Sequence, residues 1–261
     1  MILIGERLNG MFKRVGAAIV AQDEAVIVEV AQLQIAKGAN ILDLNVGPSA
    51  EDAVAAMRWL AETTRKVTDL PLAIDSPKPA VLRAGLEAAG ANALINSTTG
   101  EEEKLAELMP LASEYGCPII GLTIDENGVP RDAAGRTEVA LKIVASAMEH
   151  GVLPENVWID PVILPISCTQ NHQPEVLKAI AECKLLSDPS PKTILGLSNV
   201  SQGTQYRPLV NRTYLVMAIA SGLDGAIMDP LDDDLVDAMI TAELLMNNTV
   251  YCDDFLKAYR T

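Results

Sequence analysis

Polar side chains end almost every apolar run of this chain, and their types limit the chemistry that they could do. An ionised carboxylate accepts two parallel hydrogen bonds, and a carboxamide both donates and accepts. Such a set suits a flat polar heterocycle that carries donors and acceptors along its edges. The residues are Glu6, Asn9, Asp43, Asn45, Asp75, Asn96, Asp125, Asp160, Ser198, Asn199 and Asp229.

Helix capping is the competing explanation for these residues, since Asp, Asn and Ser are favoured just before a helix that follows a strand. We assign capping to Ser76, Thr98 and Asp232. Four others lie within or at the end of an apolar run, where an unpaired polar side chain would cost on the order of a few kcal/mol of desolvation. We therefore predict that these four face a binding site: Asp43, Asp75, Asn96 and Asp160.

Other catalytic machinery is sparse. The two histidines belong to no HxH or HExxH motif; His150 lies at a predicted helix end and His172 in a loop that could reach the rim of a site. There is no GxSxG motif and no lysine at a strand end for a Schiff base. We predict no zinc site, and a magnesium site built from carboxylates stays open.

The elements that must position these residues are eight short runs rich in Ile, Leu and Val, separated by helical patterns. Each run is too short for a helix and suits a strand buried on both faces. Eight such repeats predict a parallel (β/α)₈ TIM barrel, in which the carboxyl ends of the strands meet at one mouth. The runs are 2–8, 41–47, 70–76, 92–98, 118–125, 157–163, 193–199 and 225–231.

Two of the intervening helices have readable ends. Ser49 precedes the helical spacing of 50–67, with Asp52 three residues on, which predicts a capping box. In 76–90, Ser76 is expected to cap, Pro77 to take the first helical position and Gly90 to end the helix.

Composition bounds the class of protein. A length of 261 residues suits one barrel domain spanning 1–261, with 49% apolar and only 3% aromatic residues. The net charge of −15 argues against nucleic acid and anionic membranes as partners. No uninterrupted apolar stretch is long enough to predict a transmembrane helix. The start of the chain resembles a buried strand rather than a signal peptide. Scattered cysteines without a CxxC pair predict buried thiols in a reducing cytoplasm: Cys117, Cys168, Cys183 and Cys252.

The polar strand ends belong to longer segments that resemble a known family. These are ILIGERLNGMF, LDLNVGPSAED, AIDS, ALINST, GLTIDENGVPRD, IDPVILP, LGLSNVSQG followed by RPLVNRTYL, and LLMNNTVYCDDF. In this order, over essentially the whole chain, they resemble the methyltetrahydrofolate:corrinoid methyltransferases. That family includes the enzyme serving the corrinoid/iron-sulfur protein of acetogenic bacteria. The DxN and DP pieces are shared with dihydropteroate synthases and the folate domain of cobalamin-dependent methionine synthase.

The resemblance implies a pterin-binding barrel, a homodimer, that moves a methyl group between N5 of tetrahydrofolate and the cobalt of a cobalamin carried by a partner corrinoid protein. It implies that Asp75, Asn96 and Asp160 bind the pterin ring and that Asn199 lies beside N5. Further residues match positions that line the site or its rim: Gly196, Ser198, Gln202 and Arg207. Asp43 and Asn45 match the family motif without an assigned role, and Glu6 joins them as a possible site residue.

The departing N5 would leave as an anion, so it needs a proton or a strong hydrogen bond in the transition state. The hypothesis is that Asn199 donates to N5, with Asp75, Asp160 and ordered water supplying charge or a proton. The cobalt chemistry belongs to the cofactor. No DxHxxG motif is present to hold the corrinoid, so we expect it to arrive on another protein.

Three alternatives remain open. Dihydropteroate synthase would need basic residues for a pyrophosphate leaving group, whereas the last strand ends in the acidic MDPLDDD. The chain could also be a folate-binding module of a larger cobalamin-dependent methyltransferase, although a start at the first strand and a finish after the last helix favour a free-standing protein. The third alternative is a magnesium-dependent barrel enzyme.

Overall fold

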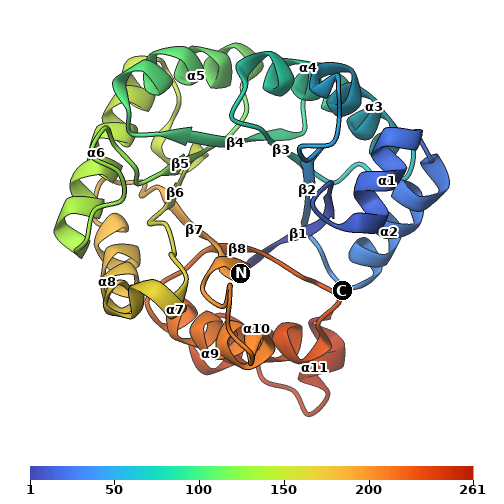
Figure 1. Cartoon of the computed structure of the whole chain (residues 1–261). Helices are drawn as coiled ribbons and strands as arrows, with labels where there is room; N and C mark the ends of the chain where they lie inside the picture. Colours follow the sequence, from blue (N-terminus) through green and yellow to red (C-terminus); the bar gives the residue numbers. More distant parts are fainter. Residues whose placement is uncertain (261) are drawn as a thin grey trace.

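Eight parallel strands close into a barrel in the computed structural model, which describes residues 1–260 (Figure 1). Each strand pairs with its sequence neighbours, and β8 pairs with β1. The predicted (β/α)₈ barrel is confirmed. The strands are β1 Ile2–Asn9, β2 Ile41–Asn45, β3 Leu72–Asp75, β4 Ala93–Thr99, β5 Ile119–Leu122, β6 Val157–Asp160, β7 Lys192–Gly196 and β8 Gly225–Met228.

Helices form the outer ring, as the right-handed crossovers of a parallel sheet require (Figure 1). Two helices follow β1, and short helical turns lie in the loops after β6 and β7. The helices are α1 Lys13–Ala21, α2 Glu24–Ala36, α3 Ala53–Arg65, α4 Pro79–Ala89, α5 Glu102–Tyr115, α6 Ala133–Glu149, α7 Ile166–Thr169, α8 Gln173–Cys183, α9 Arg207–Ala220, α10 Asp233–Leu245 and α11 Phe255–Ala258. The 3₁₀ turns are η1 Pro154–Asn156, η2 Gln170–His172 and η3 Leu197–Asn199.

The apolar interior has two parts. The larger lies between the strands and the helices. The smaller fills the barrel itself, with one side chain from each of the first seven strands, so the barrel is a packed core rather than a pore. These side chains are Ile4, Ile41, Ala73, Leu94, Ile120, Trp158 and Ile194.

Three predicted helix caps were wrong. Asp52, not Ser49, caps α3 by accepting from the N–H groups of Val54 and Ala55. Helix α4 begins at Pro79 rather than Pro77, and the Ser76 hydroxyl accepts from Lys78 N at 3.2 Å in the preceding turn. Thr98 caps no helix, because it lies buried within β4.

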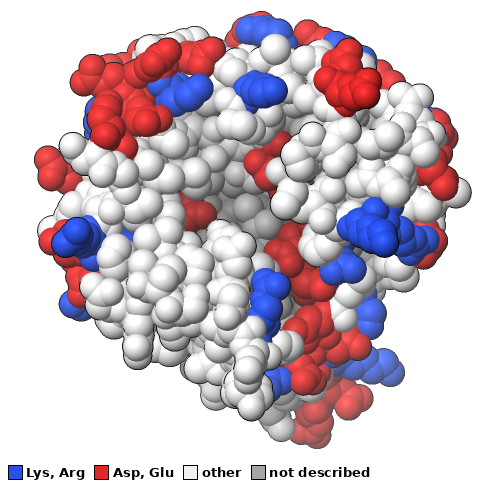
Figure 2. Space-filling model, in the orientation of Figure 1, with Lys and Arg blue, Asp and Glu red and all other residues white. Residues whose placement is uncertain are grey.

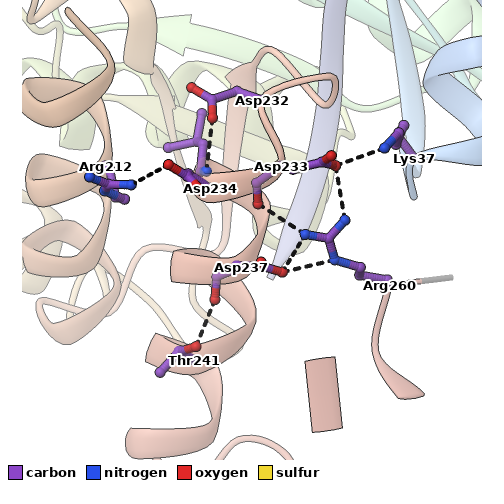
Figure 3. A network of polar contacts seen from close by, with 9 residues as sticks. Lys37, Arg212, Asp232, Asp233, Asp234, Asp237, Thr241 and Arg260 are labelled. Carbon is purple, nitrogen blue, oxygen red and sulfur yellow. Dashed lines mark hydrogen bonds and ion pairs between the residues drawn. The ribbon is translucent and has the colours of Figure 1, made fainter. Parts of the chain in front are cut away.

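The acidic run after β8 lies at the start of α10 and is paired with cations of neighbouring elements (Figure 3). Asp232 caps α10, as predicted, and Asp233 contacts Lys37 and Arg260 at 2.8 and 2.9 Å. Asp234 contacts Arg212. Exposed pairs of this kind contribute little to stability, because solvent screens them. The run therefore joins α2, α9 and the C-terminal segment through these ion pairs.

The predictions for the cysteines and histidines are partly confirmed and partly wrong. Cys117 and Cys183 are buried thiols, but Cys168 and Cys252 are exposed, so burial of all four was wrong. His150 follows α6 as predicted, whereas His172 is buried against Arg136 instead of reaching the rim. In residues 1–260, no helix has the length and apolarity needed to cross a membrane.

Candidate functional site

A polar layer lies directly above the apolar interior of the barrel, because side chains two residues apart on a strand point to the same side. Two residues after Ile4, Ile41, Ala73, Leu94 and Trp158 come five polar side chains. In β1, the register shift between Gly5 and Leu8 keeps Glu6 inside and sends Leu8 to the outer core. The layer forms the bottom of a bowl: Glu6, Asp43, Asp75, Asn96 and Asp160.

Two carboxamide–carboxylate hydrogen bonds organise the β2–β4 side of the bowl. Asn96 Nδ2 donates to Asp43 Oδ1 at 2.9 Å, and Asn45 Nδ2 donates to Asp75 Oδ2 at 2.7 Å. Asn45 also accepts from Gly47 N at 2.7 Å, which fixes its orientation. Within residues 1–260, Oδ1 of Asp75 accepts no hydrogen bond and remains an acceptor for a ligand.

Asp160 ends β6, and backbone N–H groups hold its carboxylate. Oδ1 accepts from Val162 N at 2.7 Å and Oδ2 from Gly196 N at 3.3 Å. Val162 itself has a φ of +62°, a region that β-branched residues rarely adopt. Strained backbone beside a polar bowl is typical of functional sites.

The loop after β7 closes the opposite side of the bowl. Ser198 Oγ donates to the Glu6 carboxylate, 2.9 Å from both oxygens, and Arg207 binds the Ser198 carbonyl at 3.3 Å. The Asn199 carboxamide is exposed and lies over Gly196, where an added Cβ would be 3.0 Å from its Nδ2. Since Ile194 points into the barrel, this face of Gly196 does too, and Asn199 Nδ2 therefore lies in the mouth.

Burial disfavours the charges of the bowl. Desolvation raises the pKa of Asp160 to about 6, although the N–H groups of Val162 and Gly196 oppose the shift. Desolvation, and secondly the charge of Asp75, raise the pKa of Asp43 well above its usual value. Desolvation also raises the pKa of Asp75 and of Glu6. Figure 2 shows the hollow at the centre of this face with acidic side chains in its wall.

Cations are few at the mouth. Arg7 contacts Asp229 at 3.4 Å and lies over the Phe12 ring, and Arg207 is occupied with the backbone and hydroxyl of its own loop. No group of three or more His, Cys, Asp or Glu in the described part of the chain is arranged to hold a metal ion. The bowl thus holds several carboxylates and few cations to balance them.

The structure brings most of the predicted residues together. Around the bowl lie Glu6, Asp43, Asn45, Asp75, Asn96, Asp160, Gly196, Ser198 and Asn199, with Gln202 and Arg207 exposed at the rim. Asp125 does not join them, because its carboxylate closes a turn by accepting from Asn127 N. Sequence reasoning missed Arg136 and misplaced His172, which lie behind Asp160. Arg136 falls in the apolar stripe of its helix, between Ala133 and Ala140, and that position was the available signal.

The matching family model and the similar proteins point to the same family. The family described as pterin binding enzyme matches residues 7–229. A methylcorrinoid:tetrahydrofolate methyltransferase of Eubacterium limosum is 32% identical over 262 residues, spanning 100% of this chain and 96% of that protein. A methionine synthase of Mycobacterium tuberculosis is 34% identical over 87% of this chain, which spans only 20% of that protein.

Solved structures agree on the fold. A dihydropteroate synthase of Yersinia pestis bound to a pterine–sulfa conjugate has a TM-score of 0.70 at 16% identity, covering 95% of this chain and 94% of the other. The dihydropteroate synthase of Thermus thermophilus gives 0.68 at 19% identity with the same coverage.

The raised pKa of Asp160 predicts a stability that depends on pH. The folded state holds the proton more tightly than the unfolded chain, so this group's contribution to unfolding free energy falls as pH rises from about 4 through about 6. In urea unfolding of the ligand-free protein, we expect Asp160→Asn to be more stable than wild type by about 1–3 kcal/mol at pH 7.5. The gain should be roughly half as large at pH 5.

The matched control is Asp125→Asn, at an exposed turn where asparagine can accept the same N–H bond. It should give no comparable gain in stability at pH 7.5. A loss of stability in Asp160→Asn at pH 7.5, or a gain independent of pH, would contradict the proposed cost of the Asp160 charge.

Proposed function

Because the chain belongs to the family of pterin-binding enzymes, we propose that it is a methyltransferase whose bowl holds a reduced folate. The methyl group moves between N5 of 5-methyltetrahydrofolate and the cobalt of a corrinoid on a partner protein. The observation that carries this proposal is the ring of desolvated carboxylates beneath the Asn199 carboxamide, which makes no side-chain hydrogen bond within residues 1–260. The full-length similarity to a methyltransferase named for both substrates supports it.

The bowl matches the donors of a pterin edge. The 2-amino and N3–H groups can donate in parallel to one carboxylate, and we assign them to the Asp75, Asn96 and Asp160 set. Donation by the ligand would stabilise carboxylates that the empty bowl leaves desolvated. An analogue without these donors would leave buried acceptors unpaired, so the site would discriminate against it.

In this proposal, the Asn199 carboxamide lies beside N5. Its Nδ2 can donate to the nitrogen as negative charge develops there, an interaction that is stronger in the transition state than in the ground state. A carboxamide is not an acid, so the proton must come from elsewhere. Two carboxyl groups with raised pKa values flank its loop: Asp160 binds Gly196 N, and Glu6 binds Ser198. Because Asp160 must stay ionised to accept from the pterin, we propose that Glu6 holds the proton, with water as the carrier.

The corrinoid supplies the cobalt centre that exchanges the methyl group. Neither histidine can serve as a cobalt ligand in the bowl. His150 contacts the Ser146 carbonyl at the end of α6, and His172 faces Arg136. We therefore propose that the corrinoid arrives on a partner protein and meets the folate at the mouth.

We also propose that the protein is a homodimer. Helix α9 buries only Tyr214, Leu215, Ala218 and Ile219, and it exposes apolar side chains on its outer face. Leu209 and Met217 are 55% and 47% exposed, and they border an apolar groove beside α8. In light scattering we expect twice the chain mass of 27.8 kDa, and dissociation by Met217→Glu. A wild-type monomer at all concentrations would contradict the dimer.

The one-domain organisation and the cytoplasmic location are likewise proposals. The closed barrel, with β8 against β1, and four unpaired thiols support them. We expect one cooperative unfolding transition, which a reducing agent leaves unchanged. Two separate transitions would contradict the one-domain organisation.

Dihydropteroate synthesis is less well supported. A pyrophosphate leaving group needs free cations, whereas Arg7 faces Asp229 and Arg207 binds its own loop. The structural likeness to dihydropteroate synthases, at 16–19% identity, concerns the fold alone. Pyrophosphate release from a pterin pyrophosphate and p-aminobenzoate would reverse this assignment.

Asn199→Ala tests the role of the carboxamide. With 5-methyltetrahydrofolate and a Co(I) corrinoid, we expect methyl transfer to fall by roughly 100-fold or more, because a donor used mainly in the transition state is lost. Folate affinity, measured by calorimetry, should weaken by only about tenfold. Gln205→Ala, also exposed on this loop and outside the predicted site, serves as the control and should retain most of the activity. Unchanged turnover in Asn199→Ala would remove this residue from the mechanism.

A further inference from the structure

Arg136 on α6 is a fully buried cation directly behind the bowl. It forms no ion pair with any carboxylate of residues 1–260, and a buried charge without one needs other strong partners. Its guanidinium donates from Nε to the Pro161 carbonyl at 2.8 Å and from Nη1 to the Asp132 carbonyl at 3.2 Å. Its Nη2 lies 3.2 Å from Nδ1 of His172. Since arginine can only donate, His172 Nδ1 is the acceptor and the imidazole is neutral.

The Pro161 carbonyl belongs to the same peptide group as the N–H that Asp160 binds. Arg136 holds the oxygen end of this group at 2.8 Å, and the Asp160 carboxylate holds the nitrogen end at 2.7 Å. Polarisation of the carbonyl by a cation strengthens the N–H as a donor, so the two bonds reinforce each other.

Strain in Val162 opposes this arrangement. Its φ of +62° is unfavourable for a β-branched residue. Turning the Pro161–Val162 peptide over by half a turn would return Val162 to negative φ. The same rotation would point its N–H away from Asp160. Something outside the segment must therefore hold the peptide in the orientation that serves Asp160.

We propose that Arg136, braced by His172, is a positioning residue that locks the Pro161–Val162 peptide so that its N–H stabilises the Asp160 carboxylate for the pterin. The proposal rests on the proposed function in assigning the pterin to Asp160. Arg136 touches neither substrate and acts only through this peptide.

The test asks whether a second substitution restores the folate affinity that Arg136→Met loses, which a merely structural role of Arg136 would not allow. In calorimetry with 5-methyltetrahydrofolate, we expect Arg136→Met to weaken binding about 10- to 100-fold, the effect of one hydrogen bond to a charged group. Val162→Gly alone is the reference for the double variant, because glycine keeps the backbone N–H and adopts positive φ without strain. In the double variant there is no strain left to turn the peptide, so affinity should return to within roughly fivefold of this reference.

Arg65→Met is the matched control. Arg65 also binds backbone carbonyls, those of Ala89 and Asn92, but at the opposite end of the barrel. It should lose stability and keep its folate affinity. Normal binding by Arg136→Met, no recovery in the double variant, or an equal loss in Arg65→Met would each overturn the proposal.

A second readout needs no ligand and separates this proposal from the proposed function. If wild type binds no folate, the proposed function fails, but the peptide lock can still be measured. Without the Val162 N–H, the pKa of Asp160 should rise further. The stabilisation that Asp160→Asn gives at pH 7.5 should then be larger in the Arg136→Met background than in wild type. Equal stabilisation in both backgrounds would overturn the lock.

Discussion

Carboxylates taken out of water inside the barrel mouth are the constraint on which the rest of the site depends. Four of them have pKa values raised by burial, and the cations of the mouth are engaged elsewhere. Such groups persist only if the surrounding structure holds them, since protonation or rearrangement would otherwise relieve the cost. The neighbouring residues hold these carboxylates with hydrogen bonds. Asn45 and Asn96 each donate to one carboxylate, Ser198 donates to Glu6, and two backbone N–H groups serve Asp160.

The ligand that fits this bowl brings donors rather than charge. A pterin edge provides N–H groups without a large cation, and these groups can donate to the carboxylates at the bottom of the bowl. The empty protein is then less stable than it could be, and binding offsets that cost. Sites of this kind commonly sacrifice stability for function.

The barrel and most of its bowl could be predicted from the sequence, because strands buried on both faces leave short, uninterrupted apolar runs. Asp43, Asp75 and Asp160 stood out against those runs and lie where two-residue periodicity puts them. Helix starts were harder, because Ser49 and Asp52 both satisfy the capping pattern and only the local backbone selects Asp52. The position of Arg136 in an apolar helix stripe indicates burial, but the role of Arg136 and His172 could not be predicted, because it depends on the orientation of one peptide group. The exposed thiols of Cys168 and Cys252 were missed because residue type alone predicted burial.

A crystal structure with bound 5-methyltetrahydrofolate tests the central claim most directly. We expect the pterin ring inside the bowl, its 2-amino and N3–H groups within hydrogen-bond distance of carboxylates of the Asp75, Asn96 and Asp160 set, and Asn199 Nδ2 beside N5. The Val162 N–H should still point at Asp160. A folate bound outside the bowl, or a metal ion held by these carboxylates in its place, would contradict it.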